Sequence, residues 1–240
     1  ILLFLGLLGG GIGLLSVRVA GVLFVPCQWI LLFYEKVCRL SARLPGASWI
    51  TGQPDWRKLL LVYLILGAVL FAMKKMKRRR GFVFIGCFML LAVLHNPVKG
   101  FELDVLDVGQ GESVALRSGG ETVLVDCGSS NSYVDAGSVA ADTLQSAGVR
   151  RLSAVVVTHY HADHTNGLTE VLTRLPVDTI YLPDIEDEYG VRGRLVSLAE
   201  RRGIAVVFVT VPTRITLGEA ALTFYPPLQT TGDLNEQGLT

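Results

Sequence analysis

The sequence predicts a membrane-embedded α-helical part followed by an α/β domain. Half of the 240 residues are hydrophobic and the mean hydropathy is +0.47, which is too apolar for an ordinary soluble domain. The apolar residues are concentrated in the first part of the chain. Strand-like segments follow and then alternate with helix-like ones, which is typical of a layered α/β arrangement. We therefore expect transmembrane helices in residues 1–98 and the α/β domain in residues 99–240.

The chain begins with an apolar run that extends to residue 34. A helix needs about 20 residues to span a bilayer, so residues 1–34 allow one long tilted span, or a span and a partly inserted segment. The run lacks the basic region of a signal peptide, and it starts at Ile1 without a methionine. We expect the sequence to be a fragment of a longer protein.

Residues 35–58 mix charged, apolar and aromatic side chains. Lys36 and Arg39 alternate with apolar residues, and Trp49 and Trp56 follow them. Tryptophan and basic side chains are common where a bilayer meets water. We predict a short interfacial amphipathic helix and an aromatic loop at the level of the lipid headgroups. A surface loop without a special function is the alternative.

Two further apolar runs, residues 59–73 and 82–94, flank a strongly basic turn. Six of the seven residues 74–80 are Lys or Arg. Both runs are short for spans, but basic side chains beside them can reach the membrane interface. Between two spans, a basic run is typical of a cytoplasmic loop; a nucleic-acid patch is the alternative. This topology predicts a multi-pass protein of the plasma membrane whose soluble domain is extracytoplasmic.

The pattern of the soluble part predicts strands and helices but does not choose among layered α/β arrangements. We expect strands at residues 101–105, 114–116, 121–125, 152–157, 177–182, 205–209 and 221–225. We expect helices at residues 139–147, 166–174 and 193–202.

Metal-ligand side chains cluster directly after the strand expected at 152–157. His159, His161, Asp163 and His164 occupy four of six consecutive positions. Neutral imidazole suits zinc and its neighbours, and carboxylate oxygen suits harder ions such as manganese. We predict two divalent ions, zinc or manganese: His159 and His161 hold the first, and Asp163 and His164 help to hold the second. A solvated polar loop is the alternative, but it does not account for four ligand-type residues after a buried strand.

Three stretches of the sequence resemble a known family. The pattern His-x-His-x-Asp-His at 159–164 resembles the signature of the metallo-β-lactamase fold. Leu106–Ser113 and Val123–Gly128 are similar to the start of that domain in the DNA-internalisation competence proteins (ComEC), in which membrane segments also precede it. The resemblance covers essentially the whole chain, although the membrane part matches only in kind. It implies a four-layer αββα sandwich, truncated here at its C-terminal end.

The same resemblance implies a membrane protein of DNA uptake in natural transformation. Its extracytoplasmic domain would be a metal-dependent nuclease, a phosphodiesterase acting on the strand that is not imported. Asp163 would be the catalytic residue that orients the attacking water, whose pKa a divalent ion lowers from about 15.7 toward about 7. The implied partners are DNA, single-stranded at the metals, the lipid bilayer and other DNA-uptake proteins.

Two alternatives stay open at this point. One is the same transport protein with a domain that guides DNA without catalysis. The other is a membrane-tethered metallo-hydrolase that acts on a small ester, thioester or lactam. Four intact ligand residues disfavour the first alternative, and several predicted spans disfavour the second.

Two further carboxylates, Asp107 and Asp126, end strands that we expect to converge near the histidines. We predict that both orient metal ligands; hydrogen bonding to nearby backbone amides is the alternative. The family usually has Asp at the position of Glu112, which keeps the charge but changes the reach. In the family, the segment from Asn235 onward leads to further metal ligands, so we expect this fragment to bind metal weakly and to catalyse poorly by itself.

Charge is distributed unevenly along the chain. Residues 1–98 carry 12 basic and 2 acidic side chains, whereas residues 99–240 carry 10 basic and 19 acidic ones. A domain that grips duplex DNA electrostatically is usually basic. We therefore expect transient capture of a single strand at the metals rather than strong duplex binding. One helix face offers a further candidate contact, with a solvated surface as the alternative: Arg192, Arg194, Arg201 and Arg202.

Overall fold

The computed structural model describes residues 2–44, 47, 50–75, 79–94, 100–187, 189–227 and 238–240. These belong to two units, residues 1–49 and 50–240. The domain boundary predicted after residue 98 falls among residues 95–99, which lie outside the described residues.

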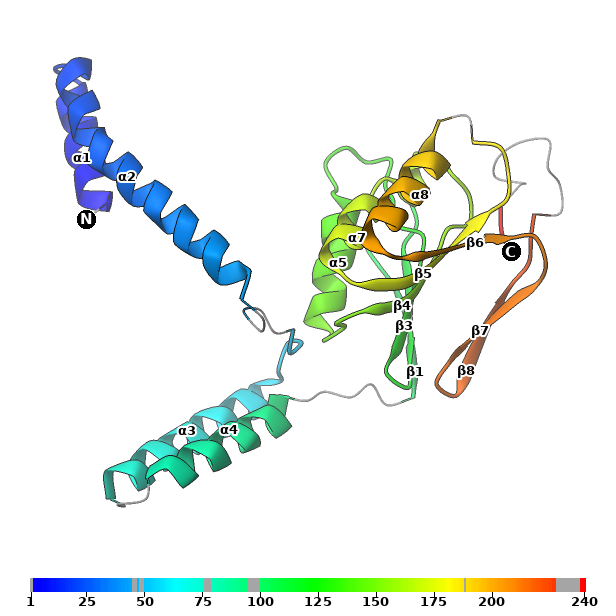
Figure 1. Ribbon diagram of the computed structural model, residues 1–240, viewed down its shortest axis with the longest axis horizontal. Coiled ribbons are helices and arrows are strands. Elements are labelled where there is room, and N and C mark those ends of the chain that lie inside the picture. The colour runs from blue at the N-terminus through cyan, green and yellow to red at the C-terminus, as the bar shows by residue number, and fades with distance from the viewer. Residues whose placement is uncertain are drawn as a thin grey trace. The chain divides into compact units, whose positions relative to one another are not determined.

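The first unit is a pair of helices (Figure 1). α1 spans Leu2–Gly13, and α2 spans Val17–Ala42. They pack against each other where Gly9 meets the ring of Phe24, because a Cβ at Gly9 would lie 2.8 Å from that ring. The apolar run at the start of the chain therefore forms two helices rather than one long span.

The last turns of α2 differ from the sequence-based expectation. A separate amphipathic helix was expected to start at residue 35, whereas α2 continues to Ala42. Residues 27–42 contain neither glycine nor proline, so nothing in the sequence ends the helix earlier. Trp56 is the first residue of the next helix rather than part of a loop, and Trp49 lies outside the described residues.

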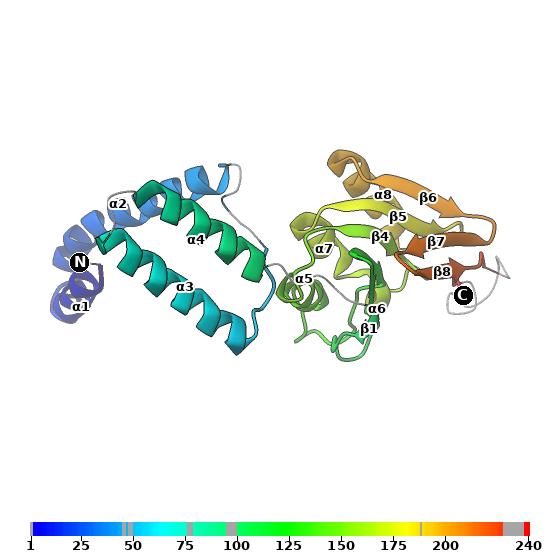
Figure 2. The same cartoon turned by 90° about the horizontal axis from the view of Figure 1, so that it is seen from below.

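Among the described residues, α2 alone is long and apolar enough to cross a membrane. A signal sequence near an N-terminus and the core helix of a soluble protein have the same length and composition. The second unit begins with a helical hairpin of α3 (Trp56–Lys75) and α4 (Arg79–Leu94), which lie side by side in both views (Figures 1 and 2). Of the basic turn predicted at residues 74–80, Lys74 and Lys75 belong to α3 and Arg79 and Arg80 belong to α4, while residues 76–78 lie outside the described residues.

A six-stranded sheet in the order β1-β2-β3-β4-β5-β6 forms the centre of the α/β domain. Its strands are β1 (Phe101–Val105), β2 (Val114–Ser118), β3 (Glu121–Val125), β4 (Leu152–Val156), β5 (Val177–Pro183) and β6 (Ala205–Val209). β1 to β3 pair antiparallel and β3 to β6 pair parallel. A separate hairpin contains β7 (Thr213–Leu217) and β8 (Ala220–Phe224). The expected strands are confirmed to within two residues, but β7 is not among them.

Helices cover one face of this sheet and the β7–β8 hairpin covers the other (Figures 1 and 2). The helices are α5 (Ala136–Ser146), α7 (Leu168–Arg174) and α8 (Val191–Arg202). Their apolar side chains form the main core with the sheet, including Leu124, Leu144, Val155, Leu168 and Ile180. On the other face a smaller core includes Leu116, Val123, Val156, Leu217 and Phe224. β4 is buried because both of its faces are covered.

These layers confirm the predicted fold class. The described residues supply a helical layer, a mixed sheet and a second small sheet, which is the arrangement of a truncated αββα sandwich. α5 begins three residues earlier than expected because the Asp135 carboxylate accepts a hydrogen bond from Ser138 N–H at 3.0 Å. A short helix, α6 (Ala162–Thr165), precedes α7 where one helix from residue 166 was expected.

Candidate metal centre

The candidate metal ligands lie at the carboxyl ends of two neighbouring parallel strands. β3 and β4 pair in register through Val125 and Val156. Asp126, which follows β3, therefore lies beside the loop that follows β4 and carries the histidine motif. This end of a parallel sheet is where binding sites form in open α/β folds.

Asp126 is the buried centre of this region. Its side chain is fully buried, and its φ of 54° lies in the left-handed region, which costs a non-glycine residue about 1–2 kcal/mol. Its carboxylate accepts three hydrogen bonds: from Thr158 N–H at 2.8 Å, from Thr158 Oγ1 at 2.5 Å and from His164 Nδ1 at 2.8 Å. Asp126 therefore holds both the loop that carries the histidines and one of the histidine rings.

Thr158 extends this network to His159. Because the Thr158 hydroxyl donates its proton to Asp126, its oxygen accepts the hydrogen bond from His159 Nδ1–H at 3.0 Å. The Nε2 atom of neutral His159 then carries a lone pair, and it is buried without a hydrogen-bond partner among the described residues. A buried unpaired polar atom costs about 1–3 kcal/mol, so a metal ion fits as the partner of this nitrogen.

The other motif residues stand close to His159. Its ring centroid lies 5.0 Å from that of His161 and 3.9 Å from that of His164. The bond from His164 Nδ1 to Asp126 leaves Nε2 as the ligand atom, as is usual for histidines that bind metals. Asp163 lies beside His164 in α6, and its charge acts on both His159 and His164. The structure brings these four residues together, and their roles as ligands stay a prediction.

Glu112 is a candidate ligand that sequence reasoning did not select. Its Oε2 lies 3.8 Å from His164 Nδ1, and ligand atoms of Glu112, Asp126 and His164 all lie within 4.8 Å of one another. Asp126 already accepts three hydrogen bonds, so we assign it the orienting role. Glu112 is about half exposed and approaches the Nδ1 side of His164, where its charge favours the proton of that ring; a ligand role for Glu112 is a proposal. The signal in the sequence was its place in the turn after β1, where the resembling family has Asp.

Backbone contacts hold the loops together. Glu112 N–H donates to Asp163 O at 3.0 Å, and Cys127 N–H donates to His164 O at 2.8 Å. Two glycines permit this approach: a Cβ at Gly111 would lie 2.2 Å from Gly128 O, and a Cβ at Gly128 would lie 2.4 Å from the carbonyl carbon of Asp163. The loops after β1 and β3 therefore clamp the motif through their main chains.

Two histidines of the site differ in their affinity for a proton. Burial lowers the pKa of His159, and the charge of His164 lowers it further. Burial also lowers the pKa of His164, but the hydrogen bond with Asp126 and the charge of that carboxylate outweigh burial and raise the pKa overall. His159 is therefore the neutral imidazole that metal binding needs, whereas a metal ion competes with a proton for His164.

Asp107 does not belong to this group. Its side chain is exposed, and it accepts a hydrogen bond from Gly109 N–H at 3.4 Å. This local bond is the alternative considered for it from the sequence, and its role in orienting a ligand stays a prediction. Asn235 lies outside the described residues, but residues 238–240 return to the site, where Leu239 N–H donates to Thr158 O at 2.9 Å.

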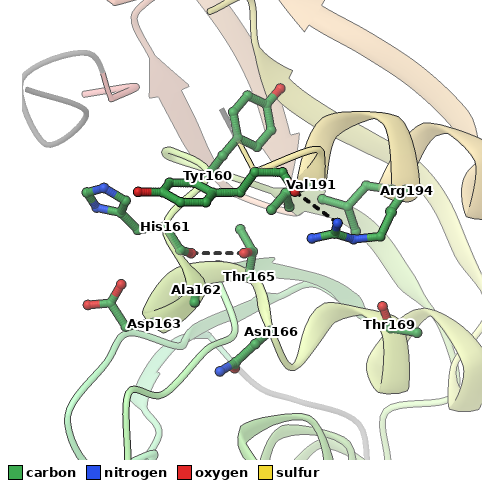
Figure 3. Close-up of a pocket in the computed structure, with 11 residues that line it drawn as sticks. Tyr160, His161, Ala162, Asp163, Thr165, Asn166, Thr169, Val191 and Arg194 are labelled. Carbon is green, nitrogen blue, oxygen red and sulfur yellow. Dashed lines mark hydrogen bonds between the residues drawn. The ribbon is translucent and has the colours of Figure 1, made fainter. Parts of the chain in front are cut away.

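A cavity of 540 Å³ opens beside the motif (Figure 3). His161 and Asp163 lie at one end of it, and Thr169 and Arg194 lie at the other. Tyr160 is fully buried in its wall, and its hydroxyl donates to Pro183 O at 2.8 Å. The volume is in the range of small-molecule and cofactor sites, so two of the candidate metal ligands, His161 and Asp163, border a space in which a substrate group fits.

Comparisons with known proteins identify one family. The model described as "Metallo-beta-lactamase superfamily" matches residues 106–233. Among solved structures, the chain is similar to a peroxy diiron species of the chemotaxis sensor ODP, with 16% identity and a TM-score of 0.40 over 55% of this chain and 52% of that chain. It is similar to the metallo-beta-lactamase fold protein YhfI from Bacillus subtilis, with 19% identity and a TM-score of 0.36 over 51% and 52%.

A third similar structure is the archaeal metallo-beta-lactamase superfamily protein ST1585 from Sulfolobus tokodaii, with 19% identity and a TM-score of 0.37 over 54% of this chain and 56% of that chain. The chain thus spans about half the length of the solved structures it matches. A search of curated proteins found no match. The family match covers more than half of the chain and includes Glu112, Asp126 and the whole motif at 159–164. The chain therefore belongs to the metallo-beta-lactamase superfamily.

Proposed function

We propose that this chain is part of a membrane DNA-uptake protein of the competence family (ComEC). In this proposal the metallo-beta-lactamase domain is a metal-dependent phosphodiesterase that acts on single-stranded DNA. Membership of the superfamily supports the general activity, metal-dependent hydrolysis. The DNA substrate and the role in uptake go beyond superfamily membership and depend on the resemblance of the sequence to the competence family.

The network around Asp126 carries the hydrolase proposal. It presents His159 Nε2 as a buried nitrogen without a partner among the described residues, and it turns Nδ1 of His164 inward so that Nε2 faces outward. A domain that only guided DNA would have no need to bury an unpaired nitrogen. The expected metal ions are two, zinc or manganese, held by His159, His161, Asp163 and His164 with Glu112 as an additional ligand.

The metal ions and the surrounding side chains have different roles in hydrolysis. When bound, divalent ions supply Lewis acidity and a nucleophile at neutral pH. Asp126 and Thr158 keep the imidazole rings in one tautomer and one orientation. Asp163 is partly exposed at the cavity, where its carboxylate would accept a hydrogen bond from the attacking water and orient it toward phosphorus.

The resemblance of the sequence supports DNA rather than a small substrate, and two further observations are compatible with it. The stretches Leu106–Ser113 and Val123–Gly128 resemble the competence family, and both form the loops that clamp the motif. The domain is acidic overall, so metal ions would create a local positive site where a phosphate is held. α2 has the length and composition of a membrane span, which agrees with a membrane protein; the extracytoplasmic place of the domain is part of the proposal.

A membrane-tethered hydrolase of a small ester or thioester is the second candidate. The observation that favours it is the volume of the cavity, which suits a small ligand as well as one nucleotide. The two candidates differ in the bond that is cleaved, so substrates separate them directly.

The test is hydrolysis by the full chain in detergent, loaded with manganese or zinc. Single-stranded DNA, bis(p-nitrophenyl) phosphate and p-nitrophenyl acetate are compared as substrates. We expect cleavage of the two phosphodiesters, and a loss of about 100-fold or more in Asp163→Asn. The matched control is Asp142→Asn, an exposed carboxylate of α5 that does not line the cavity.

A folded, metal-loaded wild type that leaves both phosphodiesters intact contradicts the proposal. Cleavage of p-nitrophenyl acetate alone would favour the small-ester hydrolase. Equal activity of Asp163→Asn and Asp142→Asn would exclude Asp163 as the catalytic residue.

A further inference from the structure

The far end of the cavity contains a cation that the metal centre does not use. Arg194 of α8 lines this end, opposite His161 and Asp163 (Figure 3). Its Nη1 donates to Tyr189 O at 2.9 Å, which holds the guanidinium at the cavity wall. In the part of the chain that the structure describes, Arg194 forms no ion pair. A guanidinium has five N–H donors, so most of its donors are available to a ligand.

The other arginines of α8 are engaged or lie elsewhere. Arg192 pairs with Asp184 at 3.0 Å and donates to Ile185 O at 3.0 Å. Arg202 donates to Thr173 O at 3.0 Å. Neither lines the cavity, and neither does Arg201. Of the four arginines expected to form a basic helix face, Arg194 alone lines this cavity among the described residues.

An exposed aromatic side chain also borders the cavity. Tyr189 also lines the cavity and is 60% exposed, unlike Tyr160, which is fully buried and bonded to Pro183 O. Tyr189 precedes α8 by two residues, and its carbonyl is the acceptor of the Arg194 hydrogen bond. The cavity thus combines an exposed aromatic side chain and a cation with two candidate metal ligands, His161 and Asp163.

This combination matches one class of ligand. Arginine binds phosphate oxygens through paired N–H donors, and an exposed aromatic ring stacks on a nucleobase whatever its identity. The surrounding domain carries 19 acidic and 10 basic side chains, so it offers little general attraction for a polyanion. A phosphate is therefore attracted to the few sites where a cation lies within a cavity.

We propose that this cavity binds the nucleotide next to the scissile phosphodiester of a single strand. Arg194 contacts the neighbouring phosphate, and Tyr189 stacks on its base. The assignment rests on the proposed phosphodiesterase function and adds the subsite that makes it prefer a strand to an isolated diester. No sequence preference is expected, because a ring face and a guanidinium do not distinguish base edges.

The primary test is binding of a fluorescein-labelled oligothymidylate to the metal-loaded full chain in detergent, with every variant in an Asp163→Asn background so that little cleavage occurs. Fluorescence anisotropy gives the association constant at several salt concentrations. Arg194→Gln should weaken binding about tenfold and reduce the slope of log K against log salt by about 0.7, which is the loss of one single-strand phosphate contact. Arg194→Lys should keep the slope, because the charge remains.

Two controls separate the cavity from the helix surface. Arg201→Gln removes an exposed charge of the same helix and should change neither affinity nor slope. Tyr189→Leu should weaken binding about tenfold with an unchanged slope, and Tyr189→Phe should bind like the wild type. The assignment is wrong if Arg194→Gln and Arg201→Gln have equal effects, or if the wild type does not bind the oligothymidylate.

Hydrolysis by the metal-loaded chain distinguishes this assignment from the proposed function. Arg194→Gln should raise KM for the oligonucleotide about tenfold and leave bis(p-nitrophenyl) phosphate, which has no neighbouring phosphate, unaffected. Binding that depends on Arg194 without any hydrolysis would remove the proposed function and keep the cavity assignment. If both substrates are hydrolysed but the salt slope is the same with and without Arg194, the proposed function is kept and the cavity assignment is wrong.

Discussion

Asp107 and Asp126 follow strands at the same end of the sheet, yet only Asp126 is part of the buried network. Asp126 is fully buried and accepts three hydrogen bonds, whereas Asp107 is exposed and accepts one, from Gly109 N–H. The difference comes from strand pairing. β3 pairs in parallel with β4, which leads into the histidine motif, while β1 is an edge strand that pairs only with β2. The neighbour of a strand, rather than its end alone, decides which carboxylate reaches the site.

The turn after β1 still contributes to the site, but by other atoms. Glu112 N–H binds Asp163 O, and the Glu112 carboxylate approaches His164. Gly111 lets the two loops meet at backbone distance. The comparison therefore predicts that the turn after β1 tolerates changes at Asp107 and does not tolerate them at Gly111.

The largest expected effect is the contrast between Asp126→Ala and Asp107→Ala. Asp126→Ala leaves three buried donors unpaired, so we expect a loss of about 3–5 kcal/mol in the free energy of unfolding. We also expect metal affinity to fall about 10–100-fold. Asp107→Ala should stay within about 0.5 kcal/mol of the wild type. Chemical denaturation followed by circular dichroism and calorimetric zinc titration measure both quantities, and equal losses in the two variants would contradict the comparison.

The next effect concerns the main chain of the two turns. A methyl group at Gly111 would meet Gly128 O at 2.2 Å, so Gly111→Ala should destabilise the domain by about 2–3 kcal/mol. Gly193→Ala is the control, because nothing lies within 4 Å of its Cβ position in α8, and alanine there should stabilise by up to about 1 kcal/mol. Denaturation midpoints report the difference. A neutral Gly111→Ala would show that the loops do not need this close approach.

A pH titration sharpens the comparison further. The raised pKa of His164 means that its ion pair with Asp126 stabilises the metal-free domain fully below the unfolded histidine pKa of about 6.5. That contribution is lost as the pH rises through the raised folded pKa. Metal affinity follows the opposite direction, since it weakens as the pH falls through the same value.

Asp126→Asn removes the largest of the charges that raise this pKa, so the pKa of His164 should fall, although the carboxylates of Asp163 and Glu112 remain beside it. Asp107→Asn should leave the titration of His164 unchanged. Histidine NMR titrations of the two metal-free variants measure the pKa directly. A similar shift in both variants would show that the Asp126 contact does not control the proton affinity of His164.

The smallest expected effect is that of Glu112→Gln. The side chain is half exposed, and an amide keeps an oxygen ligand while losing the charge. We expect metal affinity to fall by less than in Asp126→Ala, on the order of tenfold, with unchanged stability. Calorimetric zinc titration measures the ratio of the zinc affinities of the wild type and the variant. Wild-type affinity in this variant would remove Glu112 from the ligand set.

The sequence was sufficient to predict the strands of the main sheet and the position of the histidine motif after one of them. Alternating and continuous apolar runs mark the six strands, and local spacing alone keeps His159, His161, Asp163 and His164 together in one short segment after β4. The contacts that organise the site were not visible in the sequence, because they join residues far apart. Thr158 lies 32 residues from Asp126, and their bonds depend on the parallel pairing of β3 and β4.

Helix boundaries and exposed residues show the other limits. The end of α2 was misplaced because the charged residues 35–43 mark a change of environment, whereas the helix continues through them to Ala42. Arg194 was one of four similar arginines in the sequence. Only the fold separates it from Arg192, whose guanidinium is paired with Asp184.

The protonation state of the histidine nitrogens tests the metal centre most directly. Two-bond ¹H–¹⁵N NMR of the histidine-labelled full chain, assigned with single His→Gln variants, distinguishes the two neutral tautomers of each ring. The hydrogen bonds to Thr158 and Asp126 predict Nδ1–H for His159 and His164, with Nε2 unprotonated and shifted when zinc is added. Protonated Nε2 atoms in the neutral rings, or Nε2 signals that do not change when zinc is added, would contradict the proposed metal centre.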